Sequence, residues 1–333
     1  MKHARRKWLL ATAALVATPL ARAQKAGETR TLGVLSPHPK PTPEVNAYLG
    51  WIPRFRELGW RVGENLLIER PEDARHEAAL AEMAEELVRK RVDAIIAYGP
   101  EAALAAARAT TTIPIVFWGV AYPVEQGLIA SFPRPGGNVT GIAFFTGAEI
   151  YSKLFEAFRE LAPAVARIAA IETPSAMGML KGGQFLGPTG PGAAKALGFD
   201  YRSIPVANSV DIDAGLEEAV RLGAQGLVVF GTTTTYRHRQ RIAEFALRHR
   251  LPTGASQVDF VQAGCLFSYG ANTRQTVLQA ITCAAKVLSG VPPSDIPVER
   301  PERYEVALNL KTAKALGVTI PQPLLLRAER VFE

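Results

Sequence analysis

The residues of this sequence that could bind a small molecule are hydroxyl, carboxyl and tyrosine side chains, and one Gly-Pro pair, that stand directly after short apolar runs. They are Ser36, Tyr98, Gly99, Pro100 and Tyr122 in the first half of the chain, and Glu172, Thr173, Thr232, Thr233 and Ser256 in the second. Short apolar runs bounded by turn residues are typical of strands in a parallel sheet, and ligands of such sheets lie beyond the carboxyl ends of the strands. The pattern therefore predicts ligand recognition at two sheet edges.

The pair Gly99-Pro100 precedes an alanine-rich stretch that predicts a helix over Glu101–Ala109. Proline costs little in the first turn of a helix, because the N–H group that it lacks has no partner there. The free backbone N–H groups and the dipole at the start of a helix attract anions. We therefore expect this helix start to face a carboxylate of the ligand.

Most hydroxyl residues in this set have a second interpretation, because Ser and Thr are equally typical of helix caps and turns. In the run Thr232–Thr235, capping of a helix that begins at Tyr236 accounts for at least one member. Aromatic residues inside strands, here Trp118 and Phe144, are more typical of a core than of a ligand surface. Tyr122 follows its strand, so it is the better candidate for stacking on a flat ligand.

Signatures of catalysis and of cofactor or metal binding are missing. The glycine-rich segment Gly182–Gly192 lacks the Lys-Ser/Thr of a phosphate-binding loop, and the chain contains no G-x-G-x-x-G, G-x-S-x-G or H-E-x-x-H motif. His238 and His249 are eleven positions apart, unlike an i, i+4 metal pair. Cys265 and Cys283 lack the His cluster of a zinc site; they form either a disulfide or two buried thiols. We expect no enzyme, no cofactor and no metal.

The candidate residues need strands to position them, and the clearest strand lies in the stretch Thr110–Val124 (TTTIPIVFWGVAYPV). Its apolar run, Ile113–Trp118, is rich in β-branched and aromatic residues and predicts a strand that is buried on both faces. Gly119–Tyr122 is a turn of small residues that ends in the tyrosine. Pro123 then opens a predicted helix over Val124–Phe132.

The same strand–loop–helix unit recurs along the chain. The other predicted strands are Thr31–Leu35, Leu66–Glu69, Asp93–Tyr98, Asn138–Phe145, Arg167–Ile171, Tyr201–Val206, Gly226–Phe230, Thr253–Ala255, Cys265–Tyr269 and Tyr304–Leu310. The other predicted helices are Glu44–Leu58, Arg75–Lys90, Ile150–Ala162, Ile212–Leu222, Tyr236–His249 and Arg274–Leu288. The form of Thr173–Gly192 stays open. This alternation predicts an α/β fold of two lobes with a ligand cleft between them.

The first residues, Met1–Ala23, have the pattern of an export signal peptide. A basic start is followed by the apolar run Trp8–Leu20 and by the small-x-small sequence Ala-Arg-Ala. The pair Arg5-Arg6 resembles a twin-arginine signal, and general secretion is the alternative. Cleavage after Ala23 removes five basic and no acidic residues, which lowers the formal charge from +7 to +2. Such a mature chain has no electrostatic footprint for nucleic acid.

Four stretches together resemble a known protein family: TTTIPIVF, GLIASFPRPGGNVTG, FVQAGCLFSYGAN and LNLKTAKALGVTIPQPLLLRAERV. They are similar to the periplasmic substrate-binding proteins of an ABC transporter family whose characterised members are linked to aromatic amino acids. The resemblance implies a type I periplasmic-binding fold of two Rossmann-like lobes with a hinge. It implies an N-terminal lobe of residues 30–145 plus about 270–290, and a C-terminal lobe of residues 146–269 plus about 291–333.

The resemblance also implies a function. We expect a monomeric periplasmic receptor that binds a small organic ligand, an amino acid or an aromatic or carboxylate compound, by closure of its cleft. The closed form would then dock on an ABC permease in the inner membrane. A ligand sensor that docks on a membrane signalling protein is the alternative, since only the partner differs.

Two positions depart from the family pattern. Members commonly read Asp-Pro-Val where this chain has Tyr122-Pro123-Val124, so the carboxylate expected to bind a ligand ammonium is missing. Members usually have Asn-Pro where this chain has Glu172-Thr173-Pro174. Our hypothesis is that Glu172 supplies the missing carboxylate. The alternative is a solvent-facing glutamate at the end of a strand.

Overall fold

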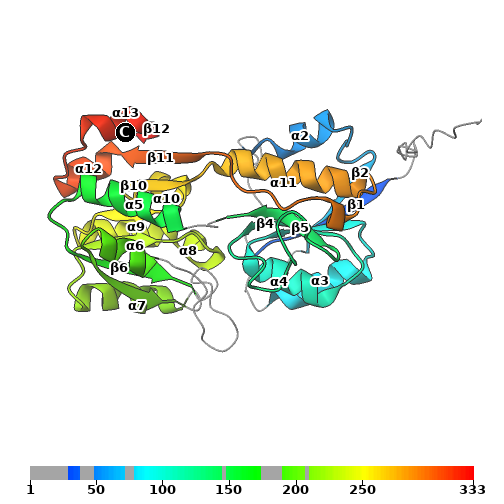
Figure 1. The fold of residues 1–333 in the computed structure, drawn as a ribbon, viewed down its shortest axis with the longest axis horizontal. Coiled ribbons are helices and arrows are strands. Elements are labelled where there is room, and N and C mark those ends of the chain that lie inside the picture. The colour runs from blue at the N-terminus through cyan, green and yellow to red at the C-terminus, as the bar shows by residue number, and fades with distance from the viewer. Residues whose placement is uncertain (1–28, 38–48, 72–78, 145–147, 174–189, 207–209) are drawn as a thin grey trace, which may run out of the picture.

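The computed structural model describes residues 29–37, 49–71, 79–144, 148–173, 190–206 and 210–333. Two sheets lie in two lobes side by side, as predicted (Figure 1). The sheet of the first lobe has the order β2-β1-β3-β4-β5, all parallel. Its strands are β1 (Arg30–Leu35), β2 (Leu66–Glu69), β3 (Ala94–Tyr98), β4 (Ile115–Val120) and β5 (Val139–Ala143).

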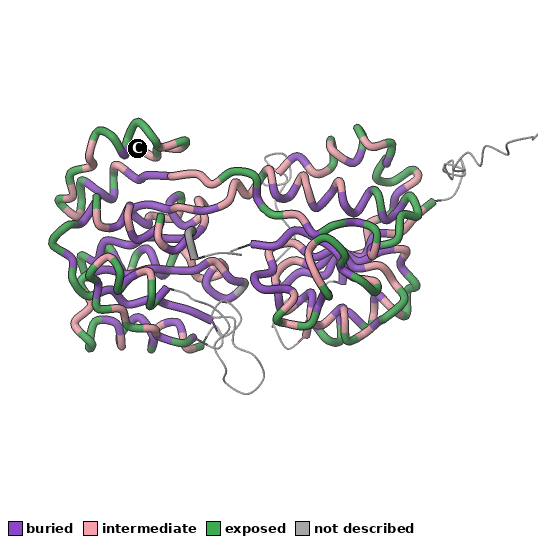
Figure 2. The backbone as a smooth tube through the Cα atoms, in the orientation of Figure 1, coloured by how far each residue is buried: buried purple, intermediate pink, exposed green. Residues whose placement is uncertain are grey.

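The sheet of the second lobe has the order β12-β11-β10-β9-β8-β6-β7, and within it only the β10–β11 pair is antiparallel. Its strands are β6 (Arg167–Glu172), β7 (Asp200–Pro205), β8 (Gly226–Val229), β9 (Thr253–Ala255), β10 (Phe267–Ala271), β11 (Tyr304–Asn309) and β12 (Ala328–Phe332). The central strands of both sheets are buried (Figure 2), as expected where helices cover both faces.

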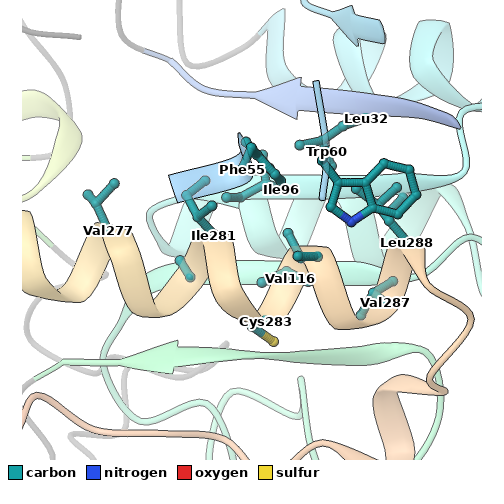
Figure 3. Packing of buried hydrophobic residues seen from close by; sticks show 14 of the residues in the cluster. Leu32, Phe55, Trp60, Ile96, Val116, Val277, Ile281, Cys283, Val287 and Leu288 are labelled. Atoms are coloured by element: carbon teal, nitrogen blue, oxygen red, sulfur yellow. The ribbon is translucent and has the colours of Figure 1, made fainter. Parts of the chain in front are cut away.

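Two helix layers cover the first sheet. One layer is α3 (Leu80–Arg89) with α4 (Pro100–Ala109), and the other is α2 (Trp51–Glu57) with α11 (Thr273–Leu288). The helix α11 comes from much later in the chain, and its Val277, Ile281 and Leu288 pack over Leu32 and Val116 of the sheet (Figure 3). Burial of side chains of this size stabilises the lobe by about 2 kcal/mol each.

The second sheet is covered in the same way. One face packs against α5 (Ala148–Leu161) and α6 (Gly190–Ala196), with α12 (Leu310–Leu316) and α13 (Gln322–Arg327) nearby. The other face packs against α7 (Asp211–Arg221), α9 (Arg239–Arg248) and α10 (Val258–Gln262). The short helix α8 (Thr233–Arg237) stands before α9 on the side of the first lobe (Figure 1).

Two of the segments that connect the lobes are tied together at Asn272, between β10 and α11. Its side-chain oxygen caps α11 by accepting from the Gln275 N–H at 2.7 Å, and its amide donates to Glu305 of β11. The backbone N–H of Asn272 donates to the carbonyl of Arg303 at 3.4 Å. One residue thus links the helix of the first lobe with a strand of the second.

The helix predicted over Val124–Phe132 is wrong, because this stretch forms turns. A single turn begins with the Gln126 N–H donating to the Tyr122 carbonyl at 3.0 Å. Gly127 then has a φ of 72°, which ends helical geometry. The Ala130 N–H donates instead to Pro135 at 2.7 Å.

The chain leaves the first lobe later than the resemblance implies. The segment that follows α11 still contacts β5 of the first lobe. The Thr140 hydroxyl of β5 donates to the carbonyl of Ile296 at 2.7 Å, and Glu299 forms a parallel β-bridge with Ile142. Residues 291–300 therefore lie on the first lobe, and β11 begins the contribution to the second. The elements α6, α10 and β12 are additions that the sequence pattern did not predict.

The two cysteines are free and lie in different lobes. Cys265 is buried in the core of the second lobe, and Cys283 is buried on α11 in the first (Figure 3). Burial raises the pKa of each thiol to about 12. Of the two alternatives left open by the sequence, buried thiols are the one the structure supports.

Candidate functional site

Three aromatic rings form a wall at the carboxyl edge of the first sheet. The ring centroid of Trp118 lies 5.4 Å from that of Tyr98 and 5.1 Å from that of Phe144. Trp118 is half-buried, and its indole N–H donates to the Thr276 hydroxyl of α11 at 3.1 Å. These rings pack against the core of the first lobe, and Tyr98 and Trp118 remain partly exposed.

Tyr122 lies in the loop after β4, as predicted, with an unusual backbone. Its φ is 55°, in the left-handed region that a bulky side chain seldom adopts. The residue is nevertheless buried, with a relative exposure of 9%, and its hydroxyl is hydrogen-bonded to the hydroxyl of Tyr151. Such backbone strain persists only where the surrounding contacts fix the residue, and it is common at binding sites.

Glu172, the last residue of β6, is buried, with a relative exposure of 6%. Its two carboxyl oxygens accept separate hydrogen bonds, from the Tyr201 hydroxyl at 2.7 Å and from the Ser203 hydroxyl at 2.6 Å. Burial raises the pKa of this carboxyl, and the two hydroxyl donors only partly offset the rise. The solvent-facing alternative for Glu172 is thus wrong.

Tyr151, on the first turn of α5, connects Tyr122 with Glu172. Its hydroxyl is hydrogen-bonded to the hydroxyl of Tyr122. Burial is the main cause of the raised pKa of Tyr151, and the nearby Glu172 carboxyl contributes to it. Its ring centroid lies 5.0 Å from that of Phe230. We call Tyr122, Tyr151, Glu172, Tyr201 and Ser203 the tyrosine–carboxyl cluster. Sequence reasoning missed Tyr151, Tyr201 and Ser203; the alternation of β7 places the last two on one face, which is the signal that could have found them.

Two predicted hydroxyl residues bind backbone groups of the loop between β8 and α8. The Ser256 hydroxyl accepts from the Gly231 N–H at 2.7 Å. Thr232 caps α8 through a reciprocal pair of bonds with Thr235, whose N–H donates to the Thr232 hydroxyl at 3.4 Å. Capping, the alternative interpretation of this run, therefore accounts for Thr232. Thr233 is the first residue of α8, and its side chain lies outside the described residues.

The remaining predicted residues lie at the same two edges. Ser36 follows β1 and is buried, and Thr173 follows Glu172 and is buried as well. Gly99 has a φ of 86° and precedes α4, whose first residue is Pro100, so this helix begins where it was expected within one residue. These residues thus lie at the carboxyl ends of the strands, where the sequence placed them.

Arg70 is a charged residue of the first edge that sequence reasoning missed. It directly follows β2 and lies near Tyr98, and burial lowers the pKa of its guanidinium. Burial also raises the pKa of Tyr98 to about 12, and the nearby Arg70 charge opposes that rise. The first edge thus has a half-buried guanidinium near Tyr98 and a carboxyl, Glu101, in the first turn of α4.

The lips of the two lobes meet at one further contact. Arg237 of α8 donates from Nη1 to the carbonyl of Pro37, which follows β1, at 3.3 Å. Within the described residues, no three side chains of His, Cys, Asp or Glu gather closely enough to bind a metal ion. The described residues at the two edges therefore include aromatic rings, the carboxyls of Glu172 and Glu101, and the guanidinium groups of Arg70 and Arg237.

Comparison with known proteins identifies the family to which the chain is similar. The family model described as ABC transporter substrate binding protein matches residues 44–332. A curated relative, the tyrosine-binding protein of Clostridioides difficile strain R20291, is 26% identical over 270 residues, which cover 81% of this chain and 76% of the relative.

Solved structures share the fold. A conserved domain protein from Vibrio cholerae superposes with a TM-score of 0.80 at 22% identity, covering 91% of this chain and 100% of the other. An ABC domain from Streptococcus pneumonia in complex with L-Trp superposes with a TM-score of 0.79 at 21% identity, covering 92% and 100%. The two-lobed architecture predicted from the sequence is confirmed by both.

Proposed function

The chain belongs to the ABC transporter substrate-binding protein family, and from this premise we propose that it is a periplasmic receptor that closes around a small organic ligand and delivers it to an ABC importer. A binding protein of this kind needs two lobes, a hinge and recognition groups on both sides of the cleft. The chain has a candidate for each of these. We propose that it binds its ligand without chemical turnover.

The observation that carries the proposal is the pair of contacts between the lobes. Near the hinge, Tyr122 meets Tyr151, and at the lips Arg237 donates to Pro37. Both contacts join residues at the carboxyl edges of the two sheets, where ligands of parallel sheets bind. Closure of the lobes about the connecting segment at Asn272 would form both contacts, and opening would break both.

We infer that the ligand carries a flat aromatic group. Tyr98 and Trp118 supply ring surface at the first edge, with Phe144 packed against Trp118, and aromatic rings favour offset or edge-on contacts with a flat ligand. The names of the relatives support the same class, since one is a tyrosine-binding protein and another holds L-Trp. Arg70 and the start of α4 would favour a carboxylate on the first-lobe side.

The location and partner follow from the sequence and the family. We propose that Met1–Ala23 directs export and is cleaved, and that the mature monomer meets an ABC permease in the inner membrane. No helix in the described part of the chain is long and apolar enough to span a bilayer.

A thermal-shift screen of amino acids, aromatic acids and other small solutes tests the proposal. A ligand present at 100 times its dissociation constant should stabilise the protein by about 2.7 kcal/mol, which gives a clear rise in melting temperature. We expect such a rise with aromatic compounds. The proposal fails if no solute in the screen raises the melting temperature.

A further inference from the structure

Within the part of the chain that the structure describes, the buried carboxyl of Glu172 accepts hydrogen bonds from two hydroxyls and forms no ion pair. We propose that Glu172 binds a cationic nitrogen of the ligand, so that the charge recognition of a ligand amine comes from the second lobe. This inference rests on the proposed receptor function and adds the class of ligand, an organic ammonium compound with an aromatic group.

The first argument is the electrostatic state of the carboxyl. Among the residues that the structure describes, no lysine, arginine or histidine forms an ion pair with Glu172, whose interactions are those with Tyr201, Ser203 and Tyr151. A buried carboxylate without a cation is costly, and the cost disappears when a cation with good geometry arrives. A site of this kind gains free energy from a positively charged ligand group.

The second argument is the hydrogen-bonding capacity that remains. A carboxylate offers about four acceptor positions on its two oxygens. Tyr201 and Ser203 occupy one position on each oxygen, at 2.7 and 2.6 Å. These bonds fix the orientation of the carboxylate and leave acceptor positions on both oxygens. A primary ammonium, with three N–H donors, is complementary to such a group.

The third argument is the set of rings near the carboxyl. Tyr151 lies between Glu172 and Tyr122, and its ring is 5.0 Å from that of Phe230. Tyrosine and phenylalanine rings attract cations through their faces, and they tolerate the apolar part of an alkylammonium. Rings and a carboxylate together are the usual surroundings of a bound organic cation, whereas an anionic ligand group would be repelled here.

The fourth argument is that the first lobe has a cation of its own. Among the described residues near that edge, the Arg70 guanidinium can attract an anionic ligand group, although the Glu101 carboxyl in the first turn of α4 offsets part of its charge. Tyr122, which leads toward the second lobe, contributes a hydroxyl that is already bonded to Tyr151. A ligand with both charges would therefore place its carboxylate at the first lobe and its nitrogen at Glu172.

Two matched series of small molecules test the inference on the unmodified protein, so that no variant has to fold. The first is L-tyrosine, tyramine and 3-(4-hydroxyphenyl)propanoate; the second is L-tryptophan, tryptamine and indole-3-propanoate. Titration calorimetry should show binding of the amino acid and of the amine in at least one series, and binding at least about 30-fold weaker for the acid that lacks nitrogen. Equal or tighter binding of the nitrogen-free acids, or no binding of any nitrogen-bearing member, would overturn the inference.

A substitution provides the second measurement. Glu172→Gln keeps the shape of the side chain and removes its charge, so affinity for the amines should fall at least about 30-fold. Glu160→Gln is the matched control, because Glu160 is in the same lobe and pairs with Arg327 at 2.7 Å on the surface; its affinities should equal those of the unmodified protein. If Glu172→Gln retains full affinity for an amine, the assignment of Glu172 is wrong.

The receptor function and the Glu172 assignment fail in different ways. If solutes without nitrogen raise the melting temperature and nitrogen-bearing ones do not, the receptor function stands and the assignment of Glu172 falls. If neither kind of solute raises it, the receptor function itself falls.

Discussion

The hydroxyl groups of Tyr122 and Tyr151 are joined by a hydrogen bond, and this bond connects the loop after β4 in the first lobe with the start of α5 in the second. Tyr122 adopts a φ of 55° in that position. The left-handed conformation costs roughly 1 kcal/mol or more for a residue of this type, and contacts of the buried ring must offset that cost.

Removing the hydroxyl of Tyr122 should loosen the closed form without disturbing either core. For Tyr122→Phe we expect a roughly 3- to 10-fold loss of affinity for the best ligand of the thermal-shift screen, since a neutral hydrogen bond contributes about 1 kcal/mol. Tyr151→Phe should have the same effect, measured by calorimetry. The double variant should lose no more than either single one, because both changes remove the same bond. Additive losses would show that the two hydroxyls act separately.

The ligand-free protein should become more stable when Glu172 is replaced by Gln. Because burial raises the folded-state pKa of Glu172 above its ordinary 4.5, the native state holds this proton to a higher pH than the unfolded chain. Stability is therefore lost as pH rises from the ordinary pKa through the folded one, and the full loss remains at neutral pH. Melting curves should show Glu172→Gln above the unmodified protein at pH 7, with the difference shrinking toward pH 4. A lower melting temperature at pH 7 would contradict this reasoning.

The same carboxyl gives a pH dependence of binding. A cationic ligand needs the ionised form of Glu172, so its affinity should fall as pH drops through the folded-state pKa, earlier than for an exposed glutamate. Calorimetry with tyramine measures this, because the phenol and the amine of tyramine keep their charge states over the acidic range. Affinity that is constant down to pH 4 would argue against an ionised Glu172 in the complex.

Strand positions were largely predictable, and for a simple physical reason. The runs predicted at Asp93–Tyr98 and Gly226–Phe230 are almost entirely apolar because both faces of these strands are buried, and β3 and β8 match them within one residue. The helix predicted over Val124–Phe132 failed because Gly127 adopts a positive φ and the backbone beyond it bonds to other turns, which the apolar spacing does not reveal. A local pattern does not reveal that the 291–300 segment pairs with β5 through backbone hydrogen bonds, because the two are far apart in the sequence.

The sequence predicted which ends of the strands carry the candidate site, but not which side chains contact one another there. Sequence reasoning placed Glu172 and Tyr122 at the ends of their strands, and the structure places them there. It could not say whether a hydroxyl faces a ligand or its own backbone, and Ser256 and Thr232 turned out to hold loops. Tyr151 was missed because its contact with Tyr122 depends on how the chain crosses between the lobes, which no short stretch encodes.

The backbone just after β9 passes close to Gly270, and this contact gives a prediction for the stability of the second lobe. A Cβ at Gly270 would lie 1.8 Å from the Ser256 carbonyl oxygen, which is backbone and cannot yield easily. We expect Gly270→Ala to destabilise the protein by about 3 kcal/mol or more, seen as a lower urea midpoint. Gly192→Ala in α6 is the control: a Cβ there meets nothing within 4 Å, so the change should be neutral or stabilise by up to about 1 kcal/mol. Equal midpoints for the two variants would refute the steric argument.

The contact of Arg237 with Pro37 should control how long a ligand stays bound. Its guanidinium donates to a backbone carbonyl of the opposite lobe at 3.3 Å, so the contact exists only while the lips are together. Arg237→Ala should therefore raise the dissociation rate of the best screen ligand about 10-fold and leave the association rate within about 3-fold, as stopped-flow fluorescence can measure. Arg239→Ala is the matched control, because Arg239 donates to the Tyr236 carbonyl at 2.8 Å within its own lobe. If both variants release the ligand at the unmodified rate, the contact at the lips does not hold the closed form, and the Tyr122–Tyr151 bond near the hinge is left to hold it.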